Sequence, residues 1–292
     1  TSLNLLSNNL SGSIPATLGN LTSLTYLHLG NNQLSGSIPT ELGNLTNLTT
    51  LALRGNQLTG SIPPELGNLN NLQYLWLNIN QLTGSIPPEL GNLTSLTHLS
   101  LRDNQLTGSI PAELGNLNNL QYLWLFGNSL TGSIPTELGN LTSLTDLRLY
   151  SNQLSGSIPT ELGNLASLTT LDLGDNQFTG EVPTSLAALP NLKNLGLWNN
   201  QFTGPASDSV VYKSGLYLRT ENGFTNEGPP IVTLIRAVNP RGNSCCGWPS
   251  PTNTSDIVGT ILDIDKVEGE TVSFTVIAVD FDGTISTTEW IV

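Results

Sequence analysis

The chain has 292 residues, of which 37% are hydrophobic, so it can bury a sizeable core and has room for two domains. Its formal net charge is −13 with only nine Lys and Arg residues, which excludes a nucleic-acid partner, because phosphate binding requires clustered basic side chains. The apolar stretches are far shorter than the roughly 20 residues of a membrane helix, so we expect no membrane insertion.

An internal repeat occupies the first two thirds of the sequence. From Leu21 onward the pattern LxxLxxLxLxxNxLxGxIPxxLGN returns every 24 residues, and residues 1–20 are the tail of an earlier unit. Such a period predicts a solenoid of about nine coils over residues 1–204, the first of them partial. The asparagine of the pattern recurs without a slip at Asn8, Asn32, Asn56, Asn80, Asn104, Asn128, Asn152, Asn176 and Asn200.

Each column of the repeat has a physical role. Leu75 and Leu77, with their equivalents, have the period-two spacing of a strand with one buried face, so we expect them to form the core. The asparagine column can bond to the backbone of adjacent coils. Gly36 and its equivalents permit a turn, and Ile38-Pro39 fixes an extended segment. Together these columns predict a parallel β-sheet on the concave face and a 3-10 or extended convex side.

The repeated motif resembles the plant-type class of leucine-rich repeats. That class is found in plant receptor ectodomains and inhibitors and in many microbial surface proteins, so the resemblance implies an extracellular location. The cysteine-containing caps usual in the plant proteins are missing, and the coils are nearly identical. The missing caps argue against a plant receptor, and the near-identical coils favour recent duplication, so we expect a microbial surface or secreted protein.

The pentapeptide QYLWL occurs at residues 73–77 and again at 121–125. Its Tyr and Trp alternate with core leucines, so we expect them to point outward from an exposed sheet. Other units carry His, Thr, Ser, Asp or Arg in these columns, which indicates a variable face. Copying of one coil pair also explains the recurrence, but Trp and Tyr are enriched at binding hot spots, and flat rings stack on sugars. The candidate ligand-binding residues are Tyr26, His28, Tyr74, Trp76, His98, Tyr122, Trp124, Phe126, Arg148, Tyr150 and Trp198.

The sequence offers no catalytic constellation. His28 and His98 lie three coils apart, roughly 15 Å at the usual strand spacing, which is too far to share a metal ion. Phosphate-binding loops and catalytic carboxylate pairs are also missing, so we expect neither an enzyme nor a cofactor. A ladder of glutamates is either a cation-binding edge or, as we favour, a solvated face. Its members are Glu41, Glu65, Glu89, Glu113, Glu137 and Glu161.

The repeat ends at residue 204, and the sequence then changes character. Residues 205–229 read as a cap or linker. Beyond them, over 230–292, candidate strands rich in Val, Ile and Thr predict a small all-β sandwich. The strands are expected at 231–238, 257–264, 271–279 and 284–292.

The stretch TVSFTVIAVDFDGTIS in this second part is similar to bacterial immunoglobulin-like and PKD-like modules. The segment is shorter than such domains usually are, so we expect a final strand to be missing or supplied by another chain. Asp280 and Asp282 are weak calcium candidates, since an Asp-Gly hairpin turn explains them equally well.

Two adjacent cysteines, Cys245 and Cys246, are the only ones in the sequence. Neighbouring Cα atoms are about 3.8 Å apart, below the usual disulfide range of roughly 4.4 to 6.8 Å. A vicinal disulfide would be strained, but an oxidising compartment favours it. Free thiols and interchain bridges are the alternatives.

These features predict a non-enzymatic extracellular binding or adhesion protein whose concave aromatic face binds a protein or a glycan. The alternative is a structural subunit of a cell-surface assembly or filament that self-associates through the solenoid end and the β-domain edge. Ice binding by a regular Asn and Thr face is a third hypothesis. Because no cap precedes Leu3 and Leu5, we expect further repeats before Thr1 or a neighbouring subunit docked there.

Overall fold

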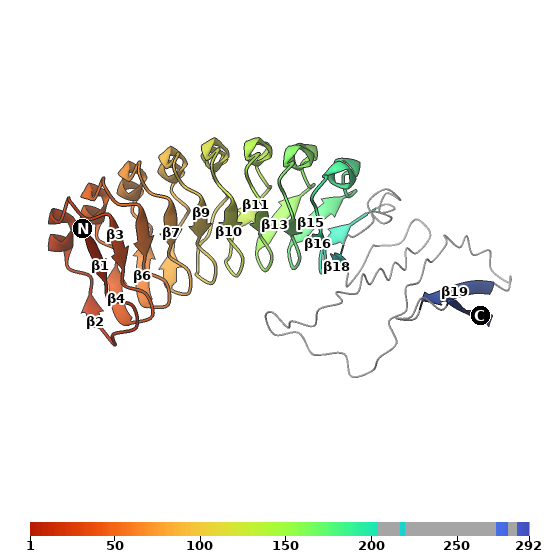
Figure 1. Cartoon of the computed structure of the whole chain (residues 1–292), viewed down its shortest axis with the longest axis horizontal. Helices are drawn as coiled ribbons and strands as arrows, with labels where there is room; N and C mark the ends of the chain where they lie inside the picture. Colours follow the sequence, from red (N-terminus) through yellow and green to blue (C-terminus); the bar gives the residue numbers. More distant parts are fainter. Residues whose placement is uncertain (204–216, 220–272, 280–284, 292) are drawn as a thin grey trace.

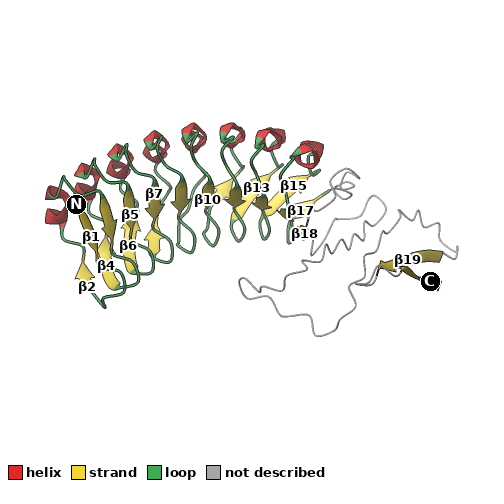
Figure 2. Cartoon of the chain, in the orientation of Figure 1, coloured by secondary structure: helices red, strands yellow, loops and turns green. Residues whose placement is uncertain are grey.

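The computed structural model describes residues 1–203, 217–219, 273–279 and 285–291. Residues 1–203 wind into a solenoid that bends into an arc, with the 3-10 helices in one row along its outer edge (Figure 1, Figure 2). The 24-residue repeat is therefore one turn of this solenoid, as the sequence predicts.

A ten-stranded parallel sheet runs along the solenoid. Each strand pairs in register with the strand of the next coil, so that Leu51 lies opposite Leu75 and Leu75 opposite Leu99. Its strands are β1 (Ser2–Asn4), β3 (Tyr26–His28), β5 (Thr50–Ala52), β7 (Tyr74–Trp76), β9 (His98–Ser100), β10 (Tyr122–Trp124), β12 (Asp146–Arg148), β14 (Thr170–Asp172), β16 (Asn194–Gly196) and β18 (Tyr217–Arg219).

Later in the coil, in every coil except the one that contains β9, the chain forms a second strand. These strands build two further parallel sheets of four strands each, one toward each end of the solenoid. The first sheet contains β2 (Ser11–Ser13), β4 (Gln33–Ser37), β6 (Gln57–Ser61) and β8 (Gln81–Thr83), and the second contains β11 (Thr131–Gly132), β13 (Gln153–Gly156), β15 (Gln177–Gly180) and β17 (Gln201–Phe202).

Each coil is completed by a 3-10 helix that follows the Ile-Pro or Val-Pro pair. Pro39, at φ −64° and ψ 134°, holds the extended conformation that the sequence predicts before the helix begins. Within this helix, Gly43 lies so close to the following coil that an added Cβ would lie 2.5 Å from the Glu65 carbonyl oxygen. The helices are η1 (Ala16–Asn20), η2 (Thr40–Asn44), η3 (Pro64–Asn68), η4 (Pro88–Asn92), η5 (Ala112–Asn116), η6 (Thr136–Asn140), η7 (Thr160–Asn164) and η8 (Thr184–Ala188).

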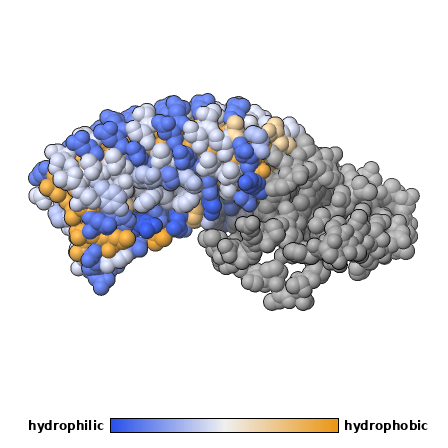
Figure 3. Space-filling view, in the orientation of Figure 1, coloured by the Kyte–Doolittle hydropathy of each residue, from blue (hydrophilic) through white to orange (hydrophobic). Residues whose placement is uncertain are grey.

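The core is a continuous stack of leucines and isoleucines from successive coils. Leu75 and Leu77 are fully buried, which confirms the strand periodicity. Apolar side chains also reach the surface, and in the view of Figure 3 they gather near the N-terminal end of the solenoid. The large apolar side chains that are exposed in the described residues are Leu6, Leu21 and Ile79.

The asparagine column ties neighbouring coils together. Asn80 accepts a hydrogen bond from the Leu58 N–H at 3.1 Å, and its amide donates to the carbonyl oxygens of Leu53 and Leu77 at 3.1 and 3.0 Å. The same three contacts recur coil after coil, for example at Asn104. The predicted structural role of this column is confirmed.

The first turn residue after each strand of the large sheet from β1 to β16 has a left-handed backbone. Gly55 and Gly127 suit that conformation, with φ of 66° and 67°. Ile79 adopts it as well, at φ 57°, although a β-branched side chain is strained there. Ile79 is also 47% exposed, so burial does not offset its strain.

Beyond the repeats, β18 pairs in parallel with β16 and so adds a tenth strand to the large sheet. Further along the chain, β19 (Ser273–Val279) and β20 (Ile285–Ile291) form an antiparallel pair, at the place of two of the four expected strands. The strands expected at 231–238 and 257–264 lie outside the described residues, and the β-sandwich stays a prediction.

The vicinal cysteines Cys245 and Cys246 and the calcium candidates Asp280 and Asp282 also lie outside the described residues. Among the helices that the structure describes, none has the length and apolar character needed to cross a membrane.

Candidate functional site

The outward side of the ten-stranded sheet carries three columns of variable side chains, which we call the aromatic face. In each strand the central leucine is buried, so the residues before and after it, and the residue two positions further on, point away from the core. The first column includes Tyr26, Thr50, Tyr74, His98, Tyr122 and Asp146; the second includes His28, Ala52, Trp76, Ser100, Trp124 and Arg148; the third includes Arg54, Asn78, Arg102, Phe126, Tyr150 and Trp198.

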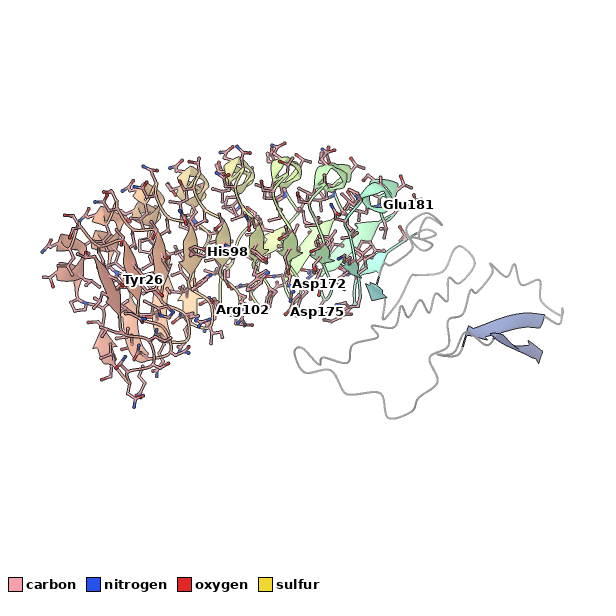
Figure 4. The ribbon with its side chains drawn as sticks, viewed as in Figure 1. Tyr26, His98, Arg102, Asp172, Asp175 and Glu181 are labelled. Atoms are coloured by element: carbon pink, nitrogen blue, oxygen red, sulfur yellow. The ribbon has the colours of Figure 1, made fainter. Side chains whose placement is uncertain are left out.

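Figure 4 illustrates this placement for the labelled residues. Tyr26, His98 and Asp172 lie on strands of the large sheet, and Arg102 and Asp175 lie in the turns that follow the strands. Glu181 lies away from them, toward the row of 3-10 helices.

The first column stacks into a ladder of rings. The His98 ring lies 4.7 Å from that of Tyr74 and 4.4 Å from that of Tyr122, centroid to centroid. The indoles of Trp76 and Trp124 meet the neighbouring tyrosines edge-on, at 5.6 and 5.8 Å. Register pairing of β7, β9 and β10 creates this ladder, because it places equivalent residues of successive coils side by side.

The small side chain of Ala52 extends the ladder toward the N-terminus. His28 and Trp76 come from β3 and β7, with β5 between them, yet their ring centroids are only 6.4 Å apart. Ala52 occupies the intervening position and is fully buried, so the two rings close over its methyl group. Tyr26 continues the contact at 6.1 Å from His28.

A second cluster of rings occupies the third column. Phe126 and Tyr150 stack at 4.2 Å with an interplanar angle of 14°. Trp198 lies 6.4 Å from Tyr150 although one coil separates them. The residue between them is Gly174, where a Cβ would clash with the indole of Trp198, so the glycine makes this approach possible.

Arginines lie against the rings of the aromatic face. The guanidinium carbon is 5.7 Å from the ring centroid of Trp76 for Arg54, 5.3 Å from that of Phe126 for Arg102, and 5.6 Å from that of Trp124 for Arg148. These distances are typical of cation–π contacts. Apart from Lys193, these three arginines are the only Lys or Arg residues of the repeats, so most of the positive charge of the repeats lies on this face.

Two of the three arginines are also paired with carboxylates. Arg148 donates from Nε and Nη2 to both oxygens of Asp146 at 2.9 Å, and Trp124 Nε1 donates to the same carboxylate at 3.0 Å. Arg102 pairs with Asp103. Arg54 has no carboxylate partner within the described part of the chain, and its Nε is buried without a hydrogen bond there.

Burial shifts the pKa of three titratable rings on this face. Burial lowers the pKa of His98, and burial together with the nearby Arg54 lowers the pKa of His28. Burial raises the pKa of Tyr150 to about 12. For these three rings, the direction of the pKa shift favours the uncharged form.

All eleven predicted site residues lie on this face, but their exposure differs from the expectation. We predicted freely exposed rings; instead the rings are half-buried, and His28 is only 4% exposed. The reason is that the rings cover one another along the ladder. Sequence reasoning missed Arg54 and Arg102. They could have been found, because they lie two coils apart in the repeat column that also holds Phe126, Tyr150 and Trp198.

Metal binding finds no support on this face. The two histidines are separated by β5 and β7, and no group of three His, Cys, Asp or Glu side chains in the described residues could hold a metal ion. The six glutamates of the repeat are all exposed on the 3-10 helices.

Comparison with known proteins shows which family has this architecture. A leucine-rich repeat region matches residues 3–153, and single leucine-rich repeats match residues 143–165 and 167–189. No curated protein matches the chain significantly.

Among solved structures, the chain is similar to the Arabidopsis receptor kinase HAESA in complex with the peptide hormone IDA and the co-receptor SERK1, with 39% identity over 75% of this chain and 38% of that chain and a TM-score of 0.68. It is similar to PEPR1 in complex with AtPEP1, with 34% identity, coverage of 75% and 38%, and a TM-score of 0.61. A plant ice-binding protein is 28% identical, with coverage of 76% and 81% and a TM-score of 0.58.

The chain spans only 38% of the length of each of these two receptor chains. The match to the leucine-rich repeat region alone nevertheless covers more than half of the 292 residues. Solenoid, repeat motif and sequence match agree, and the chain belongs to the leucine-rich-repeat family.

Proposed function

We propose that the protein is a non-enzymatic extracellular binding protein that holds a protein or peptide ligand on its aromatic face. The observation that carries this proposal is the aromatic face itself: Trp, Tyr and Arg gather there in columns that vary between otherwise near-identical coils. These three residue types dominate binding hot spots. The receptor structures to which the chain is similar hold peptides, according to their descriptions, which supports the same use here.

The ring geometry favours a protein ligand over a glycan. A sugar stacks on an open ring face, but His98 has one face against Tyr74 and the other against Tyr122. Phe126 and Tyr150 likewise cover each other. What the ladder offers to a ligand is a row of ring edges with arginine and tyrosine hydrogen-bond donors, which suits apolar side chains and backbone carbonyl groups.

An extracellular, secreted role, including adhesion, forms part of this proposal. The alternative role, a structural subunit of a surface assembly, predicts that the full chain forms polymers whose size grows with protein concentration. Light scattering over a range of concentrations distinguishes the two: a monomer supports the binding protein, and a growing polymer supports the assembly subunit.

A display library of random peptides tests the proposal even though the natural ligand is unidentified. Peptides are selected on the full chain, and each enriched clone is then tested on the Trp76→Ala, Trp124→Ala double variant. We expect most enriched clones to lose binding, because both indoles lie at the centre of the ladder. Thr46→Ala, Thr94→Ala is the matched control, since both threonines are exposed and lie outside the aromatic face.

Two results would count against the proposal. One is the failure of any clone to enrich above the double tryptophan variant. The other is clones that bind the double tryptophan variant as tightly as the unmodified chain. Melting temperatures of both variants separate a lost contact from a lost fold.

Ice binding is a second candidate function. The likeness to a plant ice-binding protein favours it, because the chain covers 81% of that protein, against 38% for each of the two receptors. Depletion of the full chain from solution as ice grows slowly through it is the direct test, and equal concentrations in ice and liquid would contradict the idea.

A further inference from the structure

A second face of the solenoid carries nearly the same residue types in every coil, whereas the residues of the aromatic face differ from coil to coil. In each coil the residues on either side of the glycine in the LxGx segment, such as Thr83 and Ser85, lie at the surface, in or beside the second strands. We call these two columns the hydroxyl face. The first column is Ser11, Ser35, Thr59, Thr83, Thr107, Thr131, Ser155, Thr179 and Thr203, and the second is Ser13, Ser37, Ser61, Ser85, Ser109, Ser133 and Ser157.

The spacing of the hydroxyl face is nearly constant from coil to coil. An added Cβ on Gly60 would lie 3.6 Å from the Ser37 Cβ of the preceding coil, and the equivalent distances at Gly84 and Gly108 are 3.5 and 3.4 Å. Backbone bonds also continue between the two four-stranded sheets, where the Thr107 and Thr131 N–H groups donate at 2.8 Å to the preceding coil. The hydroxyl groups therefore repeat at the strand spacing of about 4.8 Å.

In the described part of the chain, these hydroxyl groups contribute no side-chain hydrogen bond to the fold. Within the described residues, none of the side chains of the hydroxyl face has a hydrogen-bond partner in the chain. A different threonine column shows the contrast: Thr49 Oγ1 and Thr97 Oγ1 each donate to a carbonyl oxygen of the preceding coil at 2.9 Å. Hydrogen bonding within the fold therefore explains the threonines at Thr49 and Thr97, but it does not explain the hydroxyl face.

The residue types of the hydroxyl face do not suit a protein partner. Ser and Thr are under-represented among binding hot spots, and this face contains no aromatic or arginine side chain. It is also unlike an ordinary solubilising surface, where charges of both signs are interspersed. Both columns are free of charge until Glu181 takes the place of the next serine.

We infer that the hydroxyl face binds the surface of ice. An ice surface is an uncharged, periodic array of hydrogen-bond donors and acceptors, and the hydroxyl face offers a rigid periodic array of groups that both donate and accept. This inference rests on the second candidate function and names the surface that performs it.

The test uses the full chain and ice itself as the probe. The Thr83→Lys, Thr107→Lys variant places two long charged side chains on the hydroxyl face. Thr46→Lys, Thr94→Lys makes the same chemical change at exposed threonines elsewhere and is the matched control. Partition into slowly growing ice and inhibition of ice recrystallisation are measured for all three proteins, with melting temperatures to confirm folding.

We expect the unmodified chain and the control to partition into ice and the hydroxyl-face variant to be excluded from it. If the unmodified chain itself is excluded, ice binding and this inference both fail, while peptide binding by the aromatic face is untouched. If the unmodified chain and the hydroxyl-face variant partition equally, ice binding stands and the assignment to this face is overturned. The same conclusion follows if the control is excluded as strongly as the hydroxyl-face variant.

Discussion

The aromatic face and the hydroxyl face share one scaffold but differ in how freely their residues vary. Both are built from short parallel strands of the same coils, with leucines beneath them. On the aromatic face, Tyr74, His98, Tyr122 and Asp146 succeed one another in one column, whereas the hydroxyl face keeps Ser or Thr throughout. Coil duplication affects both faces equally and so does not account for the difference. Under the two proposals, one face meets a ligand with individual chemical features and the other meets a surface with the regularity of the repeat itself.

The leucines beneath both faces provide the largest expected effect. Leu75→Ala should lower the free energy of unfolding by about 2 to 5 kcal/mol, because it removes a fully buried side chain and leaves a cavity. Urea unfolding measures the loss. A cost as small as that of an exposed substitution would mean that the coils can collapse around the gap, and the shared rigid scaffold would have to be abandoned.

The asparagine column is the next most sensitive element, because it joins the turns between the two faces. Asn80→Ala should cost about 1 to 3 kcal/mol, since it leaves the Leu58 N–H and the Leu53 and Leu77 carbonyl groups without their partner. Asn92→Ala is the control, as Asn92 is exposed. Equal melting temperatures for the two variants would contradict the structural role of the column.

On the aromatic face, the pair of Asp146 and Arg148 should matter for both stability and binding. Asp146→Asn keeps the shape but removes the charge that Arg148 and Trp124 share, and we expect a loss of about 1 to 2 kcal/mol. Peptides selected on the unmodified chain should also bind the variant more weakly, because the indole is released. Unchanged stability together with unchanged peptide binding would show that the pair is incidental.

The aromatic face should contribute a pH dependence to stability through His98. Burial lowers the folded-state pKa of His98 below its ordinary value of 6.5, so the unfolded chain binds this proton more readily. The stability contributed by the neutral ring is then fully present above about pH 6.5 and is lost as the pH falls from there through the lowered folded pKa. Urea unfolding at pH 7.5 and pH 5 should show a smaller difference for His98→Gln than for the unmodified chain. An identical difference in both proteins would argue against a buried neutral ring.

The hydroxyl face provides the smallest expected effect on stability. Thr83→Ala should change the free energy of unfolding by no more than about 0.5 kcal/mol, because the side chain is exposed and has no partner in the described chain. Its melting temperature is compared with that of Thr97→Ala, which loses a bond to the Gln73 carbonyl oxygen. A larger cost at Thr83 than at Thr97 would mean that the hydroxyl face serves the fold.

The sequence predicts the fold of the repeats almost completely, because each coil packs against coils of nearly the same sequence, so equivalent residues pair in register. The period alone places Leu75 beside Leu51 of the preceding coil, and the asparagine in every unit predicts a side-chain hydrogen bond to the backbone of a neighbouring coil. The aromatic face is less predictable, since its geometry depends on small neighbours: His28 reaches Trp76 only across Ala52, and Trp198 reaches Tyr150 only across Gly174.

Beyond the repeats, local patterns carried less information. They placed two strands correctly, β19 and β20, and they marked residues 205–229 as a cap or linker, the segment in which β18 extends the large sheet. Tyr217-Leu218-Arg219 repeats the alternation of the other strands, with Leu218 opposite Leu195, but its pairing depends on the open edge of β16, which is a tertiary feature.

The account depends most on the claim that the aromatic face, and not the hydroxyl face, holds a peptide ligand. Isothermal titration of one selected peptide into four proteins tests it: the unmodified chain, Trp124→Ala, the hydroxyl-face variant Thr83→Lys, Thr107→Lys, and the control Thr46→Lys, Thr94→Lys. We predict that only Trp124→Ala loses affinity, by about 2 kcal/mol or more, as a hot-spot tryptophan would. If Trp124→Ala binds the peptide with unchanged affinity while the hydroxyl-face variant does not bind it, the two faces have been assigned the wrong way round.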